Sequence, residues 1–286
     1  MDDARLGVAL ILCSGVGFAT LGVLGVVAGD TGLSIPTILF FRFALATVVV
    51  WAFFGARGRI ERLRGRALAI GLALGAVGYA TMGGLYFVGL EFMTAGMVAI
   101  VLYTYPAFVL LLAAVVLDEP VGRRRLVALV VTLGGIALIT GADPAAADPR
   151  GIGIVLVAAV VYAVYITVSR TTLQGVGAPT LTAHVMPAAA GTFLVVGTVT
   201  GTLAIPSGVT EWGLIVGIAV LSTAIPIFTF FAGLSRLGAG PAAILSAIEP
   251  VATVVLGVLF LAEPVSAVVV AGGALVLLGV VLVPRR

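Results

Sequence analysis

Residues 86–121 read YFVGLEFMTAGMVAIVLYTYPAFVLLLAAVVLDEPV, and residues 230–265 read FFAGLSRLGAGPAAILSAIEPVATVVLGVLFLAEPV. Aligned without a gap at an offset of 144, the two stretches share 13 of their 36 positions. A mid-stretch proline (Pro106 and Pro250) and a closing Glu-Pro dipeptide carry the match, because leucine and alanine coincide by chance in so apolar a chain. Self-similarity at a fixed period predicts that the chain contains two copies of one structural unit.

The composition places these units in a membrane. Of the 286 residues, 62% are hydrophobic and only 9% are charged, and the mean hydropathy is +1.30. Soluble domains carry about 25% charged residues. Lipid admits only helices or closed barrels, and here the apolar runs are continuous and close to the ~20 residues that a spanning helix needs. The predicted spans are 6–27, 35–55, 67–88, 94–117, 124–142, 151–169, 180–204, 212–234, 241–262 and 265–283.

The number of spans in each copy predicts the symmetry of the molecule. Residues 1–143 and residues 144–286 each hold five predicted spans. Because five is odd, the second copy must enter the membrane upside down relative to the first. Inverted repeats with a substrate site near the midplane are typical of secondary transporters. We therefore expect an all-α polytopic membrane protein of two inverted five-helix repeats that moves a small molecule across the bilayer.

The arginines predict the orientation. If the N-terminus is cytoplasmic, 13 of the 15 arginines lie in cytoplasmic segments, with Arg150 outside and Arg42 within a span. Positive residues favour the cytoplasmic side, so we expect a multi-pass protein of the cell membrane with both termini in the cytoplasm. The net charge of +3 lies mainly in short loops beside apolar segments, where it meets lipid headgroups, and no nucleic-acid partner is expected.

Several motifs resemble one known family. Tyr105-Pro106-Ala107-Phe108 and Leu117-Asp118-Glu119-Pro120-Val121 look like the last two helices of an EamA-type unit, and Ile248-Glu249-Pro250-Val251-Ala252 repeats the first of them. Phe41-Arg42-Phe43 resembles the arginine-containing second helix of that unit. The resemblance implies a ten-helix member of the drug/metabolite transporter superfamily, whose members are mostly exporters of amino acids, other metabolites or toxic compounds.

Two charged residues lie deep within predicted spans, where a central charge costs roughly 2.5–3.5 kcal/mol on insertion scales. Arg42 lies about 10 Å from the outer edge of its span, and Glu249 about 14 Å from the inner edge of its own. In a ~30 Å core their depths differ by only about 6 Å. We expect either a charge pair that substrate or a proton breaks during transport, or two separately satisfied groups that orient helices. Neither charge recurs in the other copy, where Met186 and Tyr105 stand.

Three further ionisable residues are candidate functional groups. His184 is the only histidine and lies near the cytoplasmic face of its span, where it is a candidate proton carrier or a hydrogen-bonded packing residue. Glu119 and Glu263 each precede a proline that starts the next helix, where a negative charge meets the positive helix end. The two glutamates lie on opposite faces of the membrane, so they are not expected to act as a carboxylate pair.

The tyrosines predict a substrate cavity. Membrane tyrosines usually gather at the lipid–water interfaces, yet five of the six lie near mid-depth in the predicted spans. A buried phenol needs a hydrogen-bond partner, so we expect either a wet central cavity or packed helices whose phenols bond to the backbone. The predicted substrate-binding residues are Tyr79, Met82, Tyr86, Tyr103, Tyr105, Tyr162, Ser246 and Phe228.

Proline and glycine positions predict which spans can bend and which lie at the periphery of the bundle. Pro106 and Pro250 occupy equivalent mid-span positions, where each removes one backbone hydrogen bond and kinks its helix, so both are candidate hinges or shaping residues. The fifth and tenth spans are apolar nearly all round apart from glycines. We expect these two spans at the periphery, facing either lipid or a second protomer in a homodimer.

Three functions compete, and a secondary transporter is favoured. An intramembrane enzyme would need a nucleophile with a base, paired aspartates or a metal motif, so no catalytic residue, metal or cofactor is predicted. A receptor or scaffold would carry a sensory or docking domain, for which the short loops leave no room. Energy coupling is open between a proton gradient and facilitated diffusion. The sparsely charged, tyrosine-rich cavity favours a hydrophobic or aromatic amino acid as substrate.

Overall fold

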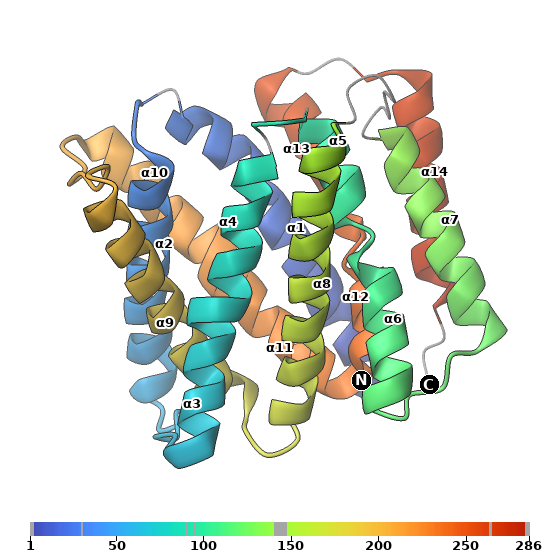
Figure 1. Cartoon of the computed structure of the whole chain (residues 1–286), viewed down its shortest axis with the longest axis horizontal. Helices are drawn as coiled ribbons and strands as arrows, with labels where there is room; N and C mark the ends of the chain where they lie inside the picture. Colours follow the sequence, from blue (N-terminus) through green and yellow to red (C-terminus); the bar gives the residue numbers. More distant parts are fainter. Residues whose placement is uncertain are drawn as a thin grey trace.

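In a computed structural model the chain is a bundle of helices that run between two opposite faces (Figure 1). The structure describes residues 3–29, 31–89, 91–93, 95–139, 148–262 and 265–283. Within these residues every regular element is helical. Among them, seven helical segments are long and apolar enough to cross a membrane, and Tyr105–Val116 and Ala267–Leu282 are shorter apolar helices.

The helices follow the predicted spans to within a few residues at each end. The first repeat contains α1 (Asp3–Gly29), α2 (Ile35–Val50), η1 (Trp51–Gly55), α3 (Gly65–Ala73), η2 (Leu74–Tyr79), α4 (Ala80–Gly89), α5 (Ala95–Leu102), α6 (Tyr105–Val116) and α7 (Arg123–Ile139). The second contains α8 (Pro149–Thr172), α9 (Ala178–Val199), α10 (Val209–Ala219), η4 (Val220–Ala224), α11 (Ile225–Leu237), α12 (Ala239–Leu245), α13 (Ile248–Leu261) and α14 (Ala267–Leu282). The predicted repeat boundary at 143/144 and Glu263 lie outside the described residues.

The core is built between the repeats. Helix α1 packs against α11 and α13, α2 packs against α9, and α7 packs against α14, so each of these contacts joins one copy to the other. Phe43 of the first copy and Phe231 of the second are both fully buried. Both chain ends lie at the same end of the bundle (Figure 1), which agrees with an even number of spans.

Two of the spans are interrupted near their middle. The fourth span is divided between α5 and α6, and the ninth between α12 and α13. Pro106 is the second residue of α6 and Pro250 the third residue of α13. Proline has no backbone N–H, and its ring clashes with the preceding turn, so the helix before it stops. A kink was predicted at each proline, and the regular α-helix is interrupted there by a turn, at residues 103–104 and 246–247. The backbone stays in the right-handed helical region through each turn, where hydrogen bonds such as that from the Ala107 N–H to the Thr104 carbonyl oxygen continue the span, and we call these two turns the helix breaks.

Two π-helical turns interrupt the third and eighth spans. They are η2, which ends at Tyr79, and η4, which contains Thr223. The repeat offset of 144 places Tyr79 on Thr223, so the two turns are equivalent features of the two copies. Single π-helical turns are rare and frequently mark functional sites.

The fifth and tenth spans, α7 and α14, lie side by side at one edge of the bundle (Figure 1). A Cβ on Gly135 would lie 2.6 Å from the carbonyl oxygen of Gly272, and one on Gly272 would lie 2.7 Å from the carbonyl oxygen of Gly135. On their outer sides Val130 is 68% exposed and Val281 66% exposed. This supports the predicted peripheral position and adds a glycine-mediated contact between the two spans. The second protomer remains a prediction.

Substitution of Gly135 by alanine is expected to destabilise the protein. The new methyl group would meet backbone atoms of α14, and overpacking of this kind costs about 1–3 kcal/mol. The expected result is a decrease of the apparent Tm on the order of 5 °C, measured for the purified protein in detergent. Gly134→Ala is the matched control, because its Cβ would meet nothing within 4 Å. Equal Tm values for the two variants would contradict the close contact.

Candidate functional site

A chain of aromatic rings crosses the interface between the two repeats. Tyr103 lies 5.9 Å from Tyr105, and Tyr105 lies 4.7 Å from Tyr162, measured between ring centroids. The chain continues through Tyr165, 5.8 Å from Tyr162, to Tyr79, 5.7 Å from Tyr165. Tyr79, Tyr103 and Tyr105 come from the first repeat and Tyr162 and Tyr165 from α8 of the second. We call these five residues the tyrosine cluster.

The helix break in the first repeat positions one end of this cluster. Tyr103 lies in the break itself, and Tyr105 is the first residue of α6. The Tyr105 hydroxyl donates a hydrogen bond of 3.4 Å to the carbonyl oxygen of Ala243 in α12, and it also interacts with the Ser246 side chain. Ser246 belongs to the break of the second repeat, so the two helix breaks lie close together.

A single carboxyl group, that of Glu249, faces the cluster. Glu249 occupies the first turn of α13, directly after the second helix break. The Tyr103 hydroxyl interacts with its carboxyl group. Tyr79, Tyr86, Tyr105 and Tyr162 lie within electrostatic range of it as well. A carboxylate in the first turn is also favoured by the positive end of the helix.

Arg42 lies across the two π-helical turns. Its side chain is 3% exposed, and its Nε donates a hydrogen bond of 3.1 Å to the Thr223 hydroxyl in η4. It also interacts with the Tyr79 side chain in η2. Thr223 in turn donates to the carbonyl oxygen of Ile218 at 2.9 Å. Arg42 therefore connects repeat-equivalent residues, Tyr79 and Thr223, and holds η2 and η4 together.

Of the two arrangements expected for Arg42 and Glu249, a charge pair or separate partners, this structure has no ion pair between them. The ion pairs of the described residues join Glu119 to Arg125 and Arg170, and Asp3 to Arg236; Arg42 and Glu249 are both described and form none with each other. Arg42 donates a hydrogen bond to the Thr223 hydroxyl, whereas Glu249 interacts with Tyr103, and Tyr79 interacts with both. Similar depth in the membrane therefore does not by itself bring the two charges together.

The remaining predicted site residues are dispersed. Met82 and Tyr86 are half-buried on α4, one and two turns beyond Tyr79. Phe228 packs at 4.6 Å against Phe54 and is not in the tyrosine cluster. His184 is buried, with Nδ1 2.8 Å from the Thr180 carbonyl oxygen and its ring 5.9 Å from Trp51. These are the contacts of a packing residue between helices.

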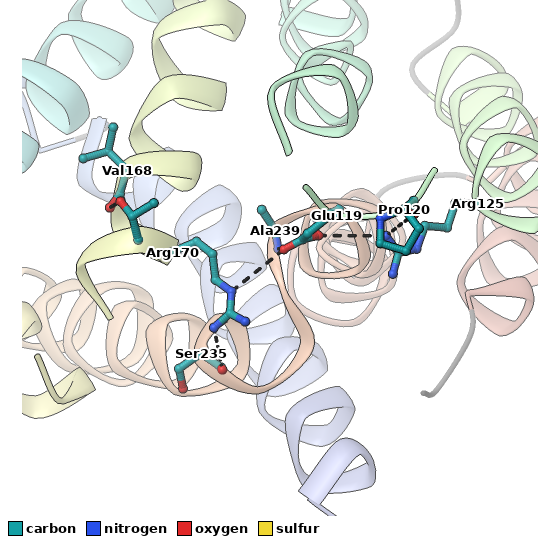
Figure 2. Close-up of polar contacts among 9 residues, drawn as sticks. Glu119, Pro120, Arg125, Val168, Arg170, Ser235 and Ala239 are labelled. Atoms are coloured by element: carbon teal, nitrogen blue, oxygen red, sulfur yellow. Dashed lines mark hydrogen bonds and ion pairs between the residues drawn. The ribbon is translucent and has the colours of Figure 1, made fainter. Parts of the chain in front are cut away.

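A second polar site joins the repeats at the end of the bundle where the chain termini lie. Glu119, between α6 and α7, accepts hydrogen bonds from the backbone N–H groups of Ala239 (2.9 Å) and Gly240 (3.3 Å) at the start of α12. Arg125 and Arg170 lie on either side of its carboxylate, each with a nitrogen 3.9 Å from one oxygen (Figure 2). Arg170 also donates to the carbonyl oxygen of Ser235 at 2.7 Å.

The Glu119 contact differs in partner from the one predicted. A negative charge was expected at the start of the next helix, α7, but the carboxylate instead meets the start of α12 in the other repeat. Gly238 makes this approach possible. Its φ of 86° and ψ of 170° suit only glycine, and a Cβ there would lie 2.5 Å from the Glu119 Oε1.

The family comparison agrees with this two-copy architecture. The sequence profile of the EamA-like transporter family matches residues 5–141 and, a second time, residues 149–284. The chain belongs to the EamA-like transporter family. The resemblance expected from the proline and Glu-Pro motifs is thereby confirmed, and membership favours a transporter over an intramembrane enzyme.

Two proteins named as transporters and one solved structure resemble the chain over much of its length. An uncharacterised transporter of Archaeoglobus fulgidus is 28% identical over 261 residues, covering 89% of this chain and 90% of that protein. An uncharacterised transporter of Bacillus subtilis is 30% identical over 196 residues, which cover 65% of this chain and 62% of that protein. A solved crystal structure with 20% identity superposes with a TM-score of 0.82, covering 96% of this chain and 95% of that one. At this identity the last match shows the fold alone.

Two residues that contact this central group were not among the predicted substrate-binding residues. Thr223 binds Arg42, and Tyr165 joins Tyr79 to Tyr162. The repeat offset contained a signal for Thr223, because it is the equivalent of Tyr79. Among the described residues, no group of three histidine, cysteine, aspartate or glutamate side chains is placed to hold a metal ion.

Arg42 and Thr223 are expected to be energetically coupled, because each satisfies the other in a buried site. Contacting residues in one hydrogen-bond network show interaction energies of about 0.5–3 kcal/mol. The measurement is a double-mutant cycle of thermal stability with Arg42→Ala and Thr223→Val. The same cycle with Arg42→Ala and Glu249→Gln should give effects much closer to additive. Strong coupling only in the cycle of Arg42→Ala with Glu249→Gln would indicate a direct charge pair between Arg42 and Glu249.

Gly238→Ala is expected to lower the apparent Tm by roughly 5 °C, because the backbone conformation is strained for alanine and the methyl group displaces the Glu119 carboxylate. In a Glu119→Ala background the loss should be smaller, since only the backbone strain remains. Gly240→Ala is the control, because its Cβ would lie 3.7 Å from Glu119 and Arg125. Equal losses from Gly238→Ala in both backgrounds would show that the carboxylate does not depend on this glycine.

Proposed function

We propose that this transporter exports small amphipathic metabolites, with hydrophobic or aromatic amino acids as the favoured class. The observation that carries the proposal is the position of the tyrosine cluster and Glu249. They lie where the broken helices of the two inverted repeats meet, and both repeats contribute side chains. Binding sites of inverted-repeat transporters are typically formed by discontinuous helices near the midplane. Export is the direction that the family resemblance implies.

The chemistry of the cluster supports this substrate class. Aromatic rings offer large apolar faces, and phenol hydroxyls offer a few directed hydrogen bonds. A ligand with an apolar body and one polar end fits such a surface better than a strongly charged solute. Among the described residues, the charged side chains that interact with the cluster are Glu249 and Arg42. The Arg42 Nε donates its hydrogen bond to Thr223.

Transport by alternating access requires the repeats to separate at one end of the bundle while they stay joined at the other. The Glu119 contact joins α6–α7 of the first repeat to α8 and α12 of the second. In our proposal this end is closed in the present conformation, and opening it requires the carboxylate to leave the start of α12. Arg125 and Arg170 hold the carboxylate in place until then.

We propose that this end faces the cytoplasm and that the protein resides in the cell membrane. The predicted cytoplasmic arginines support this orientation. The end of the bundle that contains Glu119 and Asp3 also contains Arg125, Arg170 and Arg236. Asp3 at the N-terminus pairs with Arg236 at 3.0 Å. Positive residues concentrate on the cytoplasmic side of membrane proteins.

The experiment that tests the function is flux in liposomes. Purified protein is reconstituted with radiolabelled phenylalanine, leucine, glutamate or lysine inside, with and without an imposed pH gradient. The expected result is efflux of phenylalanine and leucine, reduced at least fivefold by Tyr162→Leu, because this ring lies between Tyr105 and Tyr165. A response to the gradient would separate proton coupling from facilitated diffusion.

Glu61→Gln provides the matched control for this assay. Glu61 is exposed in the loop before α3, away from the tyrosine cluster, so its flux should equal that of the unaltered protein. Equal efflux of glutamate would contradict the proposed substrate class. Efflux of no amino acid from folded protein would redirect the search to other metabolites and then favour a receptor.

A further inference from the structure

The charge of Glu249 lacks a cationic partner within the protein. In the part of the chain that the structure describes, the ion pairs involve the carboxylates of Glu119 and Asp3. Arg42, the nearest candidate by depth, donates its Nε hydrogen bond to Thr223. Glu249 is half-buried. A carboxylate removed from water in this way without a counter-charge is costly, and the cost is relieved when a cation binds or the group becomes neutral.

The rings around Glu249 favour a cation from outside the protein. Tyr103, Tyr105 and Tyr162 follow one another at centroid distances of 5.9 and 4.7 Å, and the Tyr103 hydroxyl interacts with the carboxyl group. The face of an aromatic ring carries negative potential and attracts ammonium groups within about 6 Å of its centroid. A carboxylate close to such a cluster of rings attracts an ammonium group and repels an anion.

The repeat symmetry points the same way. The equivalent of Glu249 in the first copy is Tyr105, which lies in the same cluster. The symmetric frame therefore supplies an aromatic ring at one helix break and a carboxylate at the other. A neutral substrate would be served by phenols at both positions. The single carboxylate gives the site one negative pole, which a substrate with one positive end matches.

We propose that Glu249 and the rings of Tyr103, Tyr105 and Tyr162 form a subsite for the ammonium group of the substrate. This inference rests on the proposed function, and it adds that the ammonium group is required whereas a substrate carboxylate is dispensable. In this proposal Arg42, whose Nε donates a hydrogen bond to Thr223, does not bind a substrate carboxylate. Amphipathic primary amines should therefore bind as well as the corresponding amino acids.

A purely structural role of Glu249 makes a different prediction. A carboxylate in the first turn of α13 stabilises the helix through its positive end. In that case Glu249→Gln would lower thermal stability and leave ligand preference unchanged. Glutamine keeps the size of the side chain and can still interact with the Tyr103 hydroxyl, so it removes the charge with little change in shape.

The test is binding of three isosteric probes to the full chain in lipid nanodiscs, measured by isothermal titration calorimetry. The probes are phenethylamine (ammonium), 2-phenylethanol (neutral) and phenylacetate (anionic). The unaltered protein should bind phenethylamine at least tenfold more tightly than either of the others. Glu249→Gln should remove this preference, whereas the control Glu61→Gln should keep it. Loss of a ring in Tyr162→Leu should weaken phenethylamine binding by about threefold to thirtyfold.

The outcomes separate this inference from the proposed function. Equal binding of the three probes, no binding of phenethylamine, or a preference that survives Glu249→Gln overturns the ammonium subsite. If Glu249→Gln does not fold, retention of full phenethylamine affinity by Tyr162→Leu overturns it instead. Phenylalanine efflux without a preference for the ammonium probe supports the proposed function and contradicts the ammonium subsite. Ammonium preference without amino-acid efflux supports the subsite and contradicts the proposed amino-acid class.

Discussion

A helix that crosses lipid must pair its backbone groups internally, and a mid-span proline prevents this. The chain contains two such prolines, Pro106 and Pro250, and neighbouring helices cover the resulting breaks. Helix α1 approaches the second break so closely that a Cβ on Gly15 would lie 3.4 Å from the Glu249 backbone nitrogen and 3.6 Å from the Ser246 carbonyl oxygen. The central side chains are arranged around these two breaks.

The two repeats share a backbone plan but differ in the chemistry that they place on it. The helix breaks and the π-helical turns recur at equivalent positions, whereas the side chains there do not: Tyr105 corresponds to Glu249, and Tyr79 to Thr223. Arg42 contacts both members of the second pair. An inverted symmetric frame can exchange two conformations of similar energy, while the unlike side chains give the central site its polarity.

Charged groups have separate tasks at the middle and at the end of the bundle. In the middle, Arg42 donates a hydrogen bond to Thr223 and Glu249 interacts with Tyr103, in surroundings that contain several aromatic rings. At the end where the termini lie, the Glu119 carboxylate joins two arginines and the start of α12. This contact is partly exposed to water and lies between the repeats, which suits an interaction that forms and breaks during transport.

The sequence by itself determined the ten spans, their inverted repetition and the places of both helix breaks, because apolar length and proline position are local properties of the chain. It also indicated tyrosines as the central residues from their depth. Only the tertiary structure decided which groups meet: Arg42 binds Thr223, and Glu119 reaches across to α12. Sequence position gives depth along the membrane normal, whereas pairing depends on distances within the membrane plane, and those are set by how the helices pack.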